Sequence, residues 1–224
     1  GRLGGVDGKI TPNQVDVPNR AGGPPGTIKV VSMGFLVDDE GTALMWRGLM
    51  LTKALEQFLT DVRWGDLDYL LIDMPPGTGD VQMGLARMLP QAEMLVITTP
   101  ALAAQKVARR VADMARRSYM KIIGVVENMT EFVAPDGSRH ALFGAGGGAT
   151  LARDIGVPLV ARVPLEPAVS AGGDTGAPVA LGAPDSDAGV AFRALADRIV
   201  EELLAPIEMS GCTARLFDLV AGIE

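Results

Sequence analysis

An aspartate stands where a short apolar run meets a turn rich in proline and glycine. Asp73 follows the run YLLI at residues 69–72 and precedes MPPGTGD at residues 74–80. In open α/β sheets, ligands bind at the carboxyl ends of the strands, and a carboxylate there offers the hard oxygen that Mg²⁺ prefers, usually through water. The pattern therefore predicts a magnesium-binding acid, although an isolated aspartate at a strand end can also cap a turn.

The turn after Asp73 has the composition of a phosphate-binding loop. Two prolines at residues 75–76 stiffen it, and Gly77, Thr78 and Gly79 follow. Glycine leaves backbone N–H groups open to the close approach of a phosphate. Beside a magnesium carboxylate, such a loop is typical of a sensor for a terminal phosphate, as in the switch loops of GTPases.

Apolar runs alternate with helical patterns along most of the chain. Mostly apolar runs predict strands that helices cover on both faces, and three- or four-residue spacing of apolar side chains predicts helices. The alternation predicts a doubly wound, mainly parallel α/β sheet. The predicted strands are residues 28–33, 69–73, 94–98, 122–126 and 159–163, and the predicted helices are residues 51–62, 103–114, 150–155 and a helix from Asp185 or Ser186 to 203.

Composition favours an ordinary globular chain. Of the 224 residues, 48% are hydrophobic and 21% charged, which excludes an intrinsically disordered protein. The net charge of -7 argues against nucleic acid or an anionic membrane as partner, and no apolar run is long enough to span a membrane. We expect a cytoplasmic protein with an irregular surface segment at residues 1–27, an α/β domain at residues 28–204 and a C-terminal tail at residues 205–224.

Six short motifs, in this order along the chain, resemble one known family. They are GFLV at residues 34–37, WRG at 46–48, DMPPGTGD at 73–80, ENM at 127–129, FGAGGG at 143–148 and VPLEP at 163–167. The ordered set is similar to the Mrp/ApbC iron-sulfur cluster carriers, and the resemblance extends from about Asp7 to Ile199. These carriers are P-loop ATPases of the MinD/ParA class.

The resemblance implies a homodimeric, cytoplasmic ATPase with a sheet of the P-loop NTPase kind. Such a protein binds ATP and Mg²⁺, holds an iron-sulfur cluster between protomers and passes it to apo recipient proteins. By this resemblance Asp73 is the magnesium-associated Walker B acid, and Gly77 is a backbone donor of the phosphate-sensing loop, with Thr78 beside it.

The resemblance also assigns residues to the nucleobase. Asn128 would form a hydrogen bond with the edge of adenine, and the loop from Pro164 to Glu166 would flank the base. The alternative for Asn128 is a turn residue after the fourth predicted strand.

The phosphate-binding loop of the family has no match in this sequence. Family members carry a strand followed by a loop of the form GKGGVGKS, whose backbone and lysines hold the phosphates. In the stretch GGVDGKIT at residues 4–11, Leu3 stands in place of the first glycine and Ile10 in place of the hydroxyl. Pro12 also suits the following helix poorly. We therefore expect a sheet that lacks its first strands, as in an N-terminally truncated member, and a chain that holds ATP weakly.

The cluster site of the family is also changed. The family has a CPxC pair shortly after ENM, whereas residues 132–140 read FVAPDGSRH, with Ala134 in the first thiolate position. Thiolates hold iron-sulfur clusters, so the usual pair cannot act here. Cys212, the single cysteine, and His140 could in principle form a mixed ligand set across a dimer. The simpler interpretation is a loop histidine and a small apolar thiol.

Three functions remain open on sequence grounds. The first is the ATP-dependent cluster carrier, and the second is a truncated or degenerate interaction or regulatory module without catalysis. The third is an oxidoreductase that binds NAD(P) or flavin through G-x-G-x-x-A at residues 144–149, although only the short run 141–143 precedes that motif. Separately, a basic cluster predicts either a solvated helix face or a docking site for an acidic partner; it comprises Lys106, Arg109, Arg110, Arg116, Arg117 and Lys121.

Overall fold

The computed structural model describes residues 4–6, 8–19, 23–36, 48–74, 79–134 and 136–204. The chain divides into two compact units. The first takes in Gly1–Ala92 and Met114–Met120, and the second takes in Glu93–Asp113 and Lys121–Glu224. The domain boundaries expected at residues 27 and 204 remain a prediction.

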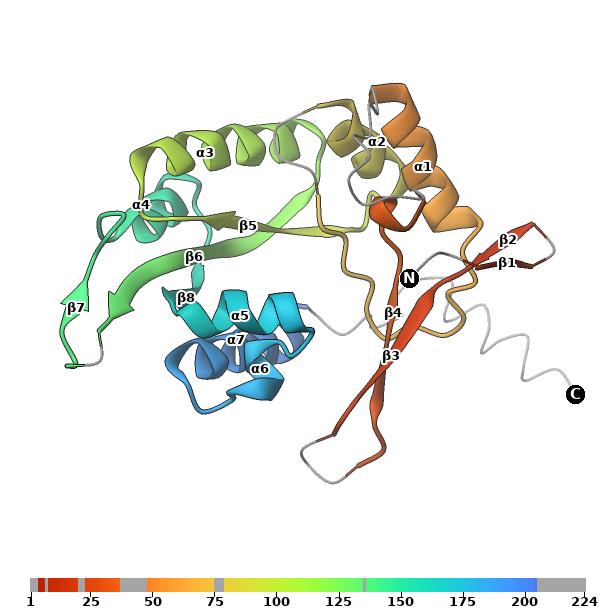
Figure 1. Ribbon diagram of the computed structural model, residues 1–224. Coiled ribbons are helices and arrows are strands. Elements are labelled where there is room, and N and C mark those ends of the chain that lie inside the picture. Colours follow the sequence, from red (N-terminus) through yellow and green to blue (C-terminus); the bar gives the residue numbers. More distant parts are fainter. Residues whose placement is uncertain are drawn as a thin grey trace, which may run out of the picture. The chain divides into compact units, whose positions relative to one another are not determined.

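The second unit is built on a sheet with a long central strand, β6 (Lys121–Val133) (Figure 1). Parallel neighbours lie on either side of it, β5 (Glu93–Thr98) and β8 (Leu159–Leu165). The short strand β7 (Arg139–His140) pairs with the end of β6 in the antiparallel sense. The strands predicted at residues 94–98, 122–126 and 159–163 are thus confirmed.

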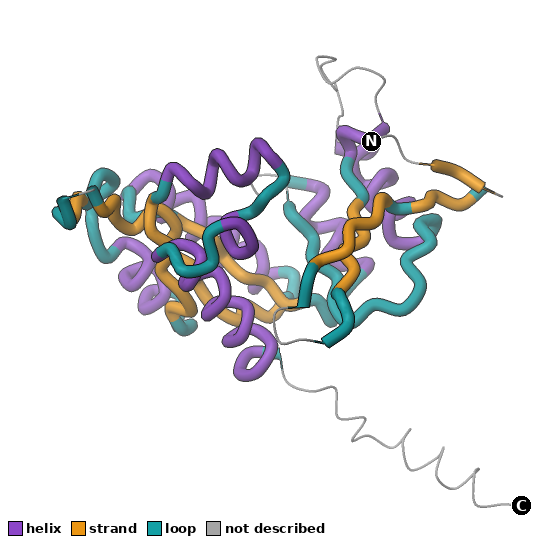
Figure 2. The backbone as a smooth tube through the Cα atoms, turned by 60° about the horizontal axis from the view of Figure 1, so that its bottom comes forward, coloured by secondary structure: helices purple, strands orange, loops and turns teal. Residues whose placement is uncertain are grey.

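Helices cover both faces of this sheet (Figures 1 and 2). On one face lie α3 (Leu102–Arg117) and α4 (Gly147–Asp154), and on the other lies α7 (Asp187–Arg198). Successive side chains of β6 point to opposite faces of the sheet. Val125 packs with Ala112 and Leu151, while Val126 packs with Val160 and Val163. This arrangement confirms the doubly wound, mainly parallel α/β fold.

Shorter elements complete the second unit. They are α5 (Pro167–Thr175), α6 (Val179–Gly182) and a final π-helical turn, η2 (Ile199–Leu203). Helix α7 begins where the sequence predicted, because the Ser186 hydroxyl accepts a hydrogen bond of 3.1 Å from the N–H of Gly189 and so caps the helix.

The first unit contains two antiparallel hairpins and a helical pair. Strands β1 (Gly4–Val6) and β2 (Lys9–Thr11) form one hairpin, and β3 (Asn13–Val17) and β4 (Gly26–Val30) form the other. A 3₁₀ turn, η1 (Met33–Leu36), follows, and α1 (Gly48–Thr60) packs on α2 (Asp80–Met88).

Two expectations for the start of the chain differ from the structure. Strands lie within residues 4–17, which the sequence pattern indicated to be irregular, because cross-strand pairs such as Val15 with Ile28 stabilise a hairpin that is too short to show a clear period. The strand predicted at residues 28–33 is β4, and it ends at Val30. The stretch at residues 4–11 is a hairpin rather than a phosphate loop, and its Lys9 ammonium donates to the Thr60 carbonyl at 3.0 Å.

The strand predicted before Asp73 is absent from the structure. Residues 69–73 have no regular secondary structure, and the side chain of Leu71 is 88% exposed. The apolar run has a strand-like composition, but a strand also needs a neighbour for its backbone hydrogen bonds, and no described strand pairs with it.

Candidate functional site

The carboxyl ends of the parallel strands meet at one edge of the sheet in the second unit. Across this edge Glu127 is in register with Thr98 of β5 and with Arg162 of β8. Glu127 and Thr98 are buried, whereas Arg162 is exposed. Edges of this kind hold the ligand sites of open α/β sheets.

Asn128, the residue expected at the adenine edge, lies half-buried at this position. Its Oδ1 accepts a hydrogen bond of 2.9 Å from the N–H of Met129, whose backbone is left-handed with φ of 55°. Asn128 lies within β6, just before the irregularity in the pairing of β6 with β8 between Asn128 and Phe132. Its Oδ1 is used by Met129, and among the described residues nothing accepts a hydrogen bond from its Nδ2 group.

Glu127 is the site residue that the sequence did not reveal. It is fully buried, and its Oε2 accepts a hydrogen bond from the backbone N–H of Gly148. Its Oε1 has no hydrogen-bond partner among the described residues and lies 3.7 Å from the Nε of Arg162. A charged residue directly after the apolar run 122–126 was the available signal, because carboxylates are rarely buried without a specific partner.

The glycine-rich turn at residues 144–148 packs tightly against this edge. Gly146 caps α4 in a left-handed conformation with φ of 71°, and a Cβ on Gly147 would lie 2.3 Å from the carbonyl oxygen of Pro100. The Glu127 carboxylate occupies the amino end of α4, where a dinucleotide fingerprint would place pyrophosphate. The NAD(P) or flavin hypothesis is therefore not favoured.

The residues expected to flank the base lie at the carboxyl end of β8 and directly after it. Pro164 is in β8, and Glu166 is the N-cap of α5. The Oε1 of Glu166 accepts a hydrogen bond of 2.9 Å from the N–H of Ala188 at the start of α7, so this carboxylate contributes to the capping of α7 next to Ser186.

The loop that carries the cysteine pair in the family is a polar hairpin here. The hydroxyl of Ser138 donates to the Oδ1 of Asp136 at 2.6 Å, and the N–H of Ser138 donates to the same oxygen at 2.9 Å. These two bonds lower the pKa of Asp136, because both favour the carboxylate. The Ser138 hydroxyl also lies 2.9 Å from the Nε2 of His140. Cys212 lies outside the described residues, as do Gly77 and Thr78.

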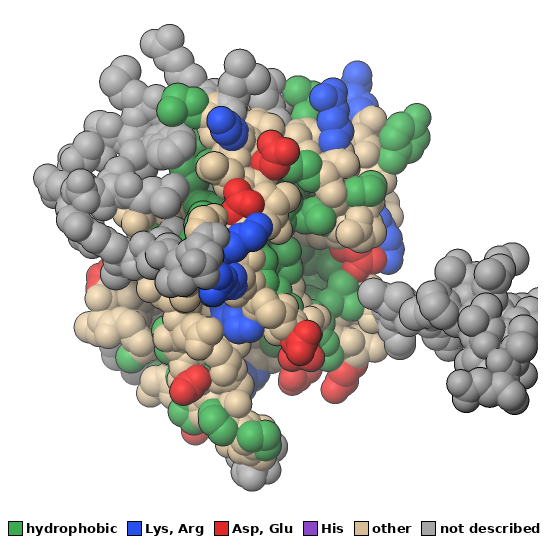
Figure 3. Space-filling model, turned by 90° about the vertical axis from the view of Figure 1, so that its right-hand side faces the viewer, with side chains coloured by type: hydrophobic (Ala, Val, Ile, Leu, Met, Phe, Trp, Pro, Cys, Tyr) green, Lys and Arg blue, Asp and Glu red, His purple; other side chains and the backbone are tan. Residues whose placement is uncertain are grey.

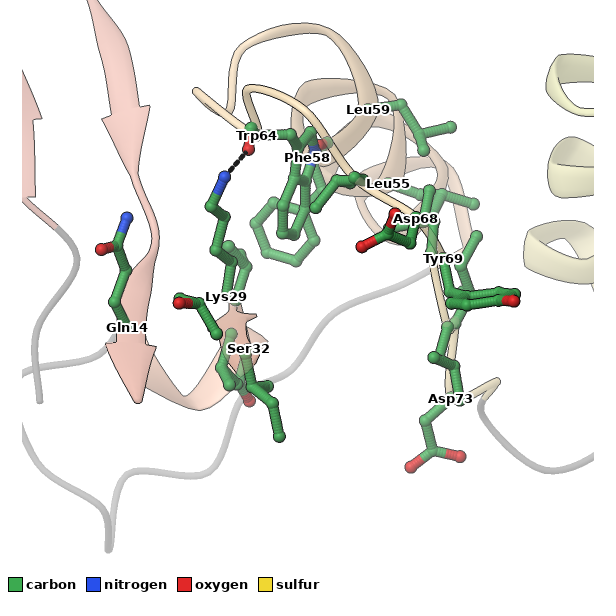
Figure 4. A pocket seen from close by; sticks show the side chains of 18 of the residues that line it. Gln14, Lys29, Ser32, Leu55, Phe58, Leu59, Trp64, Asp68, Tyr69 and Asp73 are labelled. Carbon is green, nitrogen blue, oxygen red and sulfur yellow. Dashed lines mark hydrogen bonds between the residues drawn. The ribbon is translucent and has the colours of Figure 1, made fainter. Parts of the chain in front are cut away.

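Asp73 lies in the first unit at the end of the irregular segment. Its side chain is exposed, and Figure 4 shows the carboxylate pointing away from Phe58 and Trp64. An exposed carboxylate can meet a hydrated magnesium ion. Within the described residues no group of three or more histidine, cysteine, aspartate or glutamate side chains is arranged to hold a metal directly.

A hollow of about 1270 Å³ lies beside Asp73 within the first unit. Its walls are largely apolar, and the ammonium of Lys29 donates to the Trp64 carbonyl across one wall (Figure 4). Figure 3 shows hydrophobic side chains exposed among charged ones on one face of the molecule. Apolar walls of this kind suit contact with other apolar structure rather than recognition of a small polar ligand.

Two members of the basic cluster form ion pairs. Arg109 pairs with Asp154, and Lys121 pairs with Glu93. Arg116 and Arg117, in the last turn of α3, also have interactions. These contacts agree with a solvated helix face. In the part of the chain that the structure describes, no helix has both the length and the apolar character required to cross a membrane.

A parallel sheet with helices on both faces and polar groups at its carboxyl edge defines a doubly wound α/β protein. A nucleotide-binding protein of Archaeoglobus fulgidus, solved in complex with ADP, superposes with a TM-score of 0.63 at 27% identity, over 92% of this chain and 71% of that chain. The cell division ATPase MinD of Pyrococcus furiosus shares the fold, with a TM-score of 0.50 at 24% identity, over 69% of this chain and 58% of that chain.

Sequence comparison identifies the family. A family model described as ParA, NUBPL iron-transfer P-loop NTPase, matches residues 3–200, and the chain belongs to this family. The iron-sulfur cluster carrier protein of Mycobacterium leprae is 48% identical over 176 residues, which cover 76% of this chain and 46% of that protein. The carrier of Saccharolobus solfataricus is 42% identical over 181 residues, which cover 80% of this chain and 61% of that protein. The resemblance inferred from the motifs is thus confirmed, and the chain spans about half the length of several curated relatives that it matches.

Proposed function

We propose that this chain forms part of an ATP-dependent iron-sulfur cluster carrier, which acts as a homodimer in the cytoplasm and passes clusters to apo recipient proteins. The observation that carries the proposal is the match to the iron-transfer P-loop NTPase family over residues 3–200. The curated relatives named as iron-sulfur cluster carrier proteins support it.

For the segment of the first unit that begins at Asp73, the proposed role is contact with phosphate and magnesium. Its exposed carboxylate would accept magnesium through a water molecule, and the backbone N–H of Gly77, with Thr78 beside it, would face the terminal phosphate. When bound, Mg·ATP supplies a terminal phosphate whose loss changes the contacts of the loop. Residues 73–78 would thereby report whether ATP or ADP is present.

For the end of β6, in the second unit, the proposed role is contact with the nucleobase. The Nδ2 group of Asn128 can donate to a ring nitrogen of adenine, while its Oδ1 remains bonded to Met129. Pro164 and Glu166 would flank the base. Because Glu166 already holds the start of α7 through Ala188, we expect it to act mainly by shaping the wall of the site.

The residues of the loop at 134–140 do not fit an iron-sulfur cluster. The described part of this loop offers a carboxylate, a hydroxyl and an imidazole rather than a thiolate, and clusters take soft thiolate ligands. We therefore assign no cluster ligand in this loop, and the carriage of cargo is proposed from the family alone.

Calorimetric titration with Mg·ATP and Mg·GTP tests the proposed nucleotide site. We expect weak but saturable binding that favours ATP. Asn128→Ala should lower the affinity for ATP about 5- to 10-fold, the effect of one lost hydrogen bond to a ligand, with a smaller change for GTP. Asp73→Asn should weaken the binding of Mg·ATP more than that of ATP without magnesium. His140→Ala, in the exposed hairpin, serves as the control and should bind like the wild type.

The second candidate is a regulatory or interaction module without catalysis. Ala134 in the first thiolate position is the observation that favours it. This module should show no saturable response to either nucleotide in the same titration. Micromolar binding of Mg·ATP is incompatible with it, whereas equal and non-saturating signals for ATP and GTP would contradict the carrier.

A further inference from the structure

Glu127 places a charged group in the interior of the second unit, at the carboxyl end of its central strand. The side chain has no exposed surface. Removing a carboxylate from water is unfavourable unless positive charge and hydrogen bonds compensate it. A residue of this kind restricts its surroundings strongly, because every partner must stay in place for the charge to remain compensated.

The compensation comes from two directions. The N–H of Gly148, in the first turn of α4, donates to Oε2, and the amino end of a helix carries partial positive charge. The Nε of Arg162, from the neighbouring strand, lies 3.7 Å from Oε1. Glu127 therefore joins three elements, β6, β8 and α4, at the edge where Asn128 also lies.

Glu127 also contacts the chain on either side of an arm, at Thr130 near its start and at Gly148 in the helix that follows it. We define the arm as residues 129–134 and 136–143, which contain the end of β6, β7 and the hairpin between them. Near the start of the arm, where the pairing of β6 with β8 is interrupted before Phe132, the hydroxyl of Thr130 donates to the backbone carbonyl of Glu127 at 3.2 Å. Where the chain returns, Gly148 donates to the Glu127 carboxylate.

The returning contact leaves little space for movement. A Cβ on Gly148 would lie 2.6 Å from the Cβ of Glu127 and 2.9 Å from its Oε2. Only glycine fits at this distance without displacement of the glutamate. A shift of β6 at residues 127–128 is therefore transmitted to the turn at residues 144–148, and with it to the base of the arm.

We propose that Glu127 is a positioning residue whose carboxylate fastens the returning side of this arm, through Gly148, to the strand that carries Asn128, so that occupancy of the nucleobase site is transmitted to the hairpin at residues 134–140. The fastening follows from the contacts of Glu127. The coupling to nucleotide rests on the proposed function.

Amide hydrogen exchange of the whole chain, followed by mass spectrometry, tests the fastening. Glu127→Gln keeps the size of the side chain but removes its charge, and charge-assisted hydrogen bonds are the stronger ones. We expect arm peptides to exchange about tenfold faster than in the wild type, with α3 unchanged. Glu93→Gln is the control, because it removes an ion pair with Lys121 at the opposite end of the sheet and should leave the arm unchanged. Equal arm exchange in Glu127→Gln and wild type would overturn the fastening.

A second variant changes the other partner of the contact between Glu127 and Gly148. Gly148→Ala should displace the carboxylate and speed arm exchange as Glu127→Gln does, and the two changes together should be less than additive. Gly173→Ala is the matched control, because a Cβ there meets nothing within 4 Å. Additive effects of the two changes would contradict a shared contact. If Gly148→Ala unfolds the chain, the amide exchange of Glu127→Gln alone tests the fastening of the arm.

Saturating Mg·ADP tests the coupling. We expect ADP to slow arm exchange at least about threefold in the wild type and in Glu93→Gln, but not in Glu127→Gln, although calorimetry shows that this variant still binds ADP. A merely structural role would leave the response to ADP intact. If the wild type binds ADP but the amide exchange of its arm does not change, the coupling is overturned and the proposed function is not contradicted. A wild-type chain that binds no ADP contradicts the proposed function, and the exchange of Glu127→Gln without nucleotide still decides the fastening.

Discussion

Carboxylates of similar chemistry have different roles in this protein because their surroundings differ. Glu127 is fully buried, and one of its oxygens has no hydrogen-bond partner among the described residues. Asp136 is exposed and accepts two hydrogen bonds from Ser138, and Asp73 is exposed at the end of an irregular segment. A buried charge fixes its neighbours, whereas an exposed acid stays available to ions and to local donors. Burial and partners, rather than residue type, therefore separate a positioning residue from a candidate metal ligand.

The pKa of Asp136 provides a prediction at this scale. It is lowered from the ordinary value of 3.8, first by the hydroxyl of Ser138 and then by its backbone N–H. Ser138→Ala removes the larger cause, so the pKa of Asp136 should rise part of the way back, while Ser138→Thr keeps a hydroxyl and should keep the pKa low. NMR titration of the carboxyl carbon measures it, and an unchanged pKa in Ser138→Ala would contradict the assignment.

The sign of the associated pH dependence follows from the direction of the shift. A carboxyl whose pKa is lower in the folded state stabilises that state above the unfolded-state pKa, and this contribution is lost as the pH falls through the folded-state value. The contribution of Asp136 is thus present at neutral pH and lost in acid, below pH about 4. Ser138→Ala should reduce this acid dependence in the hairpin.

At the scale of elements, the sequence predicted those whose stability depends on their own pattern. Helices α1, α3 and α7 and strands β5, β6 and β8 appear where apolar periodicity placed them. The run at residues 69–73 has the same apolar character, but it has no strand partner among the described residues. The prediction of a strand there was wrong because an apolar pattern contains no information about the neighbour that a strand needs. Glu127 escaped prediction for a related reason, since its main partner, Gly148, is 21 residues further along the chain.

The start of α7 provides a prediction for a single element. The hydroxyl of Ser186 accepts a hydrogen bond from the N–H of Gly189, and the carboxylate of Glu166 accepts one from the N–H of Ala188 in the same turn. Ser186→Ala should destabilise α7 by about 1 kcal/mol, which corresponds to roughly fivefold faster amide exchange in peptides from residues 187–198. Ser170→Ala, at an exposed position of α5, should change the exchange of α7 by less than about twofold. An equal effect of both substitutions would show that the hydroxyl of Ser186 does not hold the helix.

At the scale of the whole molecule, the fold of the family and the ligands that a cluster needs are separate requirements. The family match extends over residues 3–200, and the second unit retains the parallel sheet, its carboxyl edge and Asn128. The described part of the loop at residues 134–140 contains Ala134 and polar side chains in place of thiolates. The fold depends on apolar packing that many sequences satisfy, while a cluster needs particular ligands. A family member can therefore keep its fold while its cargo chemistry changes.

The cysteine content makes this separation testable. The chain has one cysteine, Cys212, so a symmetric dimer supplies half of the thiolates of a Cys₄ site. After anaerobic reconstitution with iron and sulfide and removal of excess reagents, we expect less than about one cluster per ten chains by iron analysis and visible absorbance. Cys212→Ser should behave in the same way. A relative that keeps the cysteine pair, treated in parallel, should bind a cluster and so validate the procedure. A stoichiometric cluster that is lost in both Cys212→Ser and His140→Ala would instead establish a mixed ligand set across the dimer and contradict the expected low cluster content.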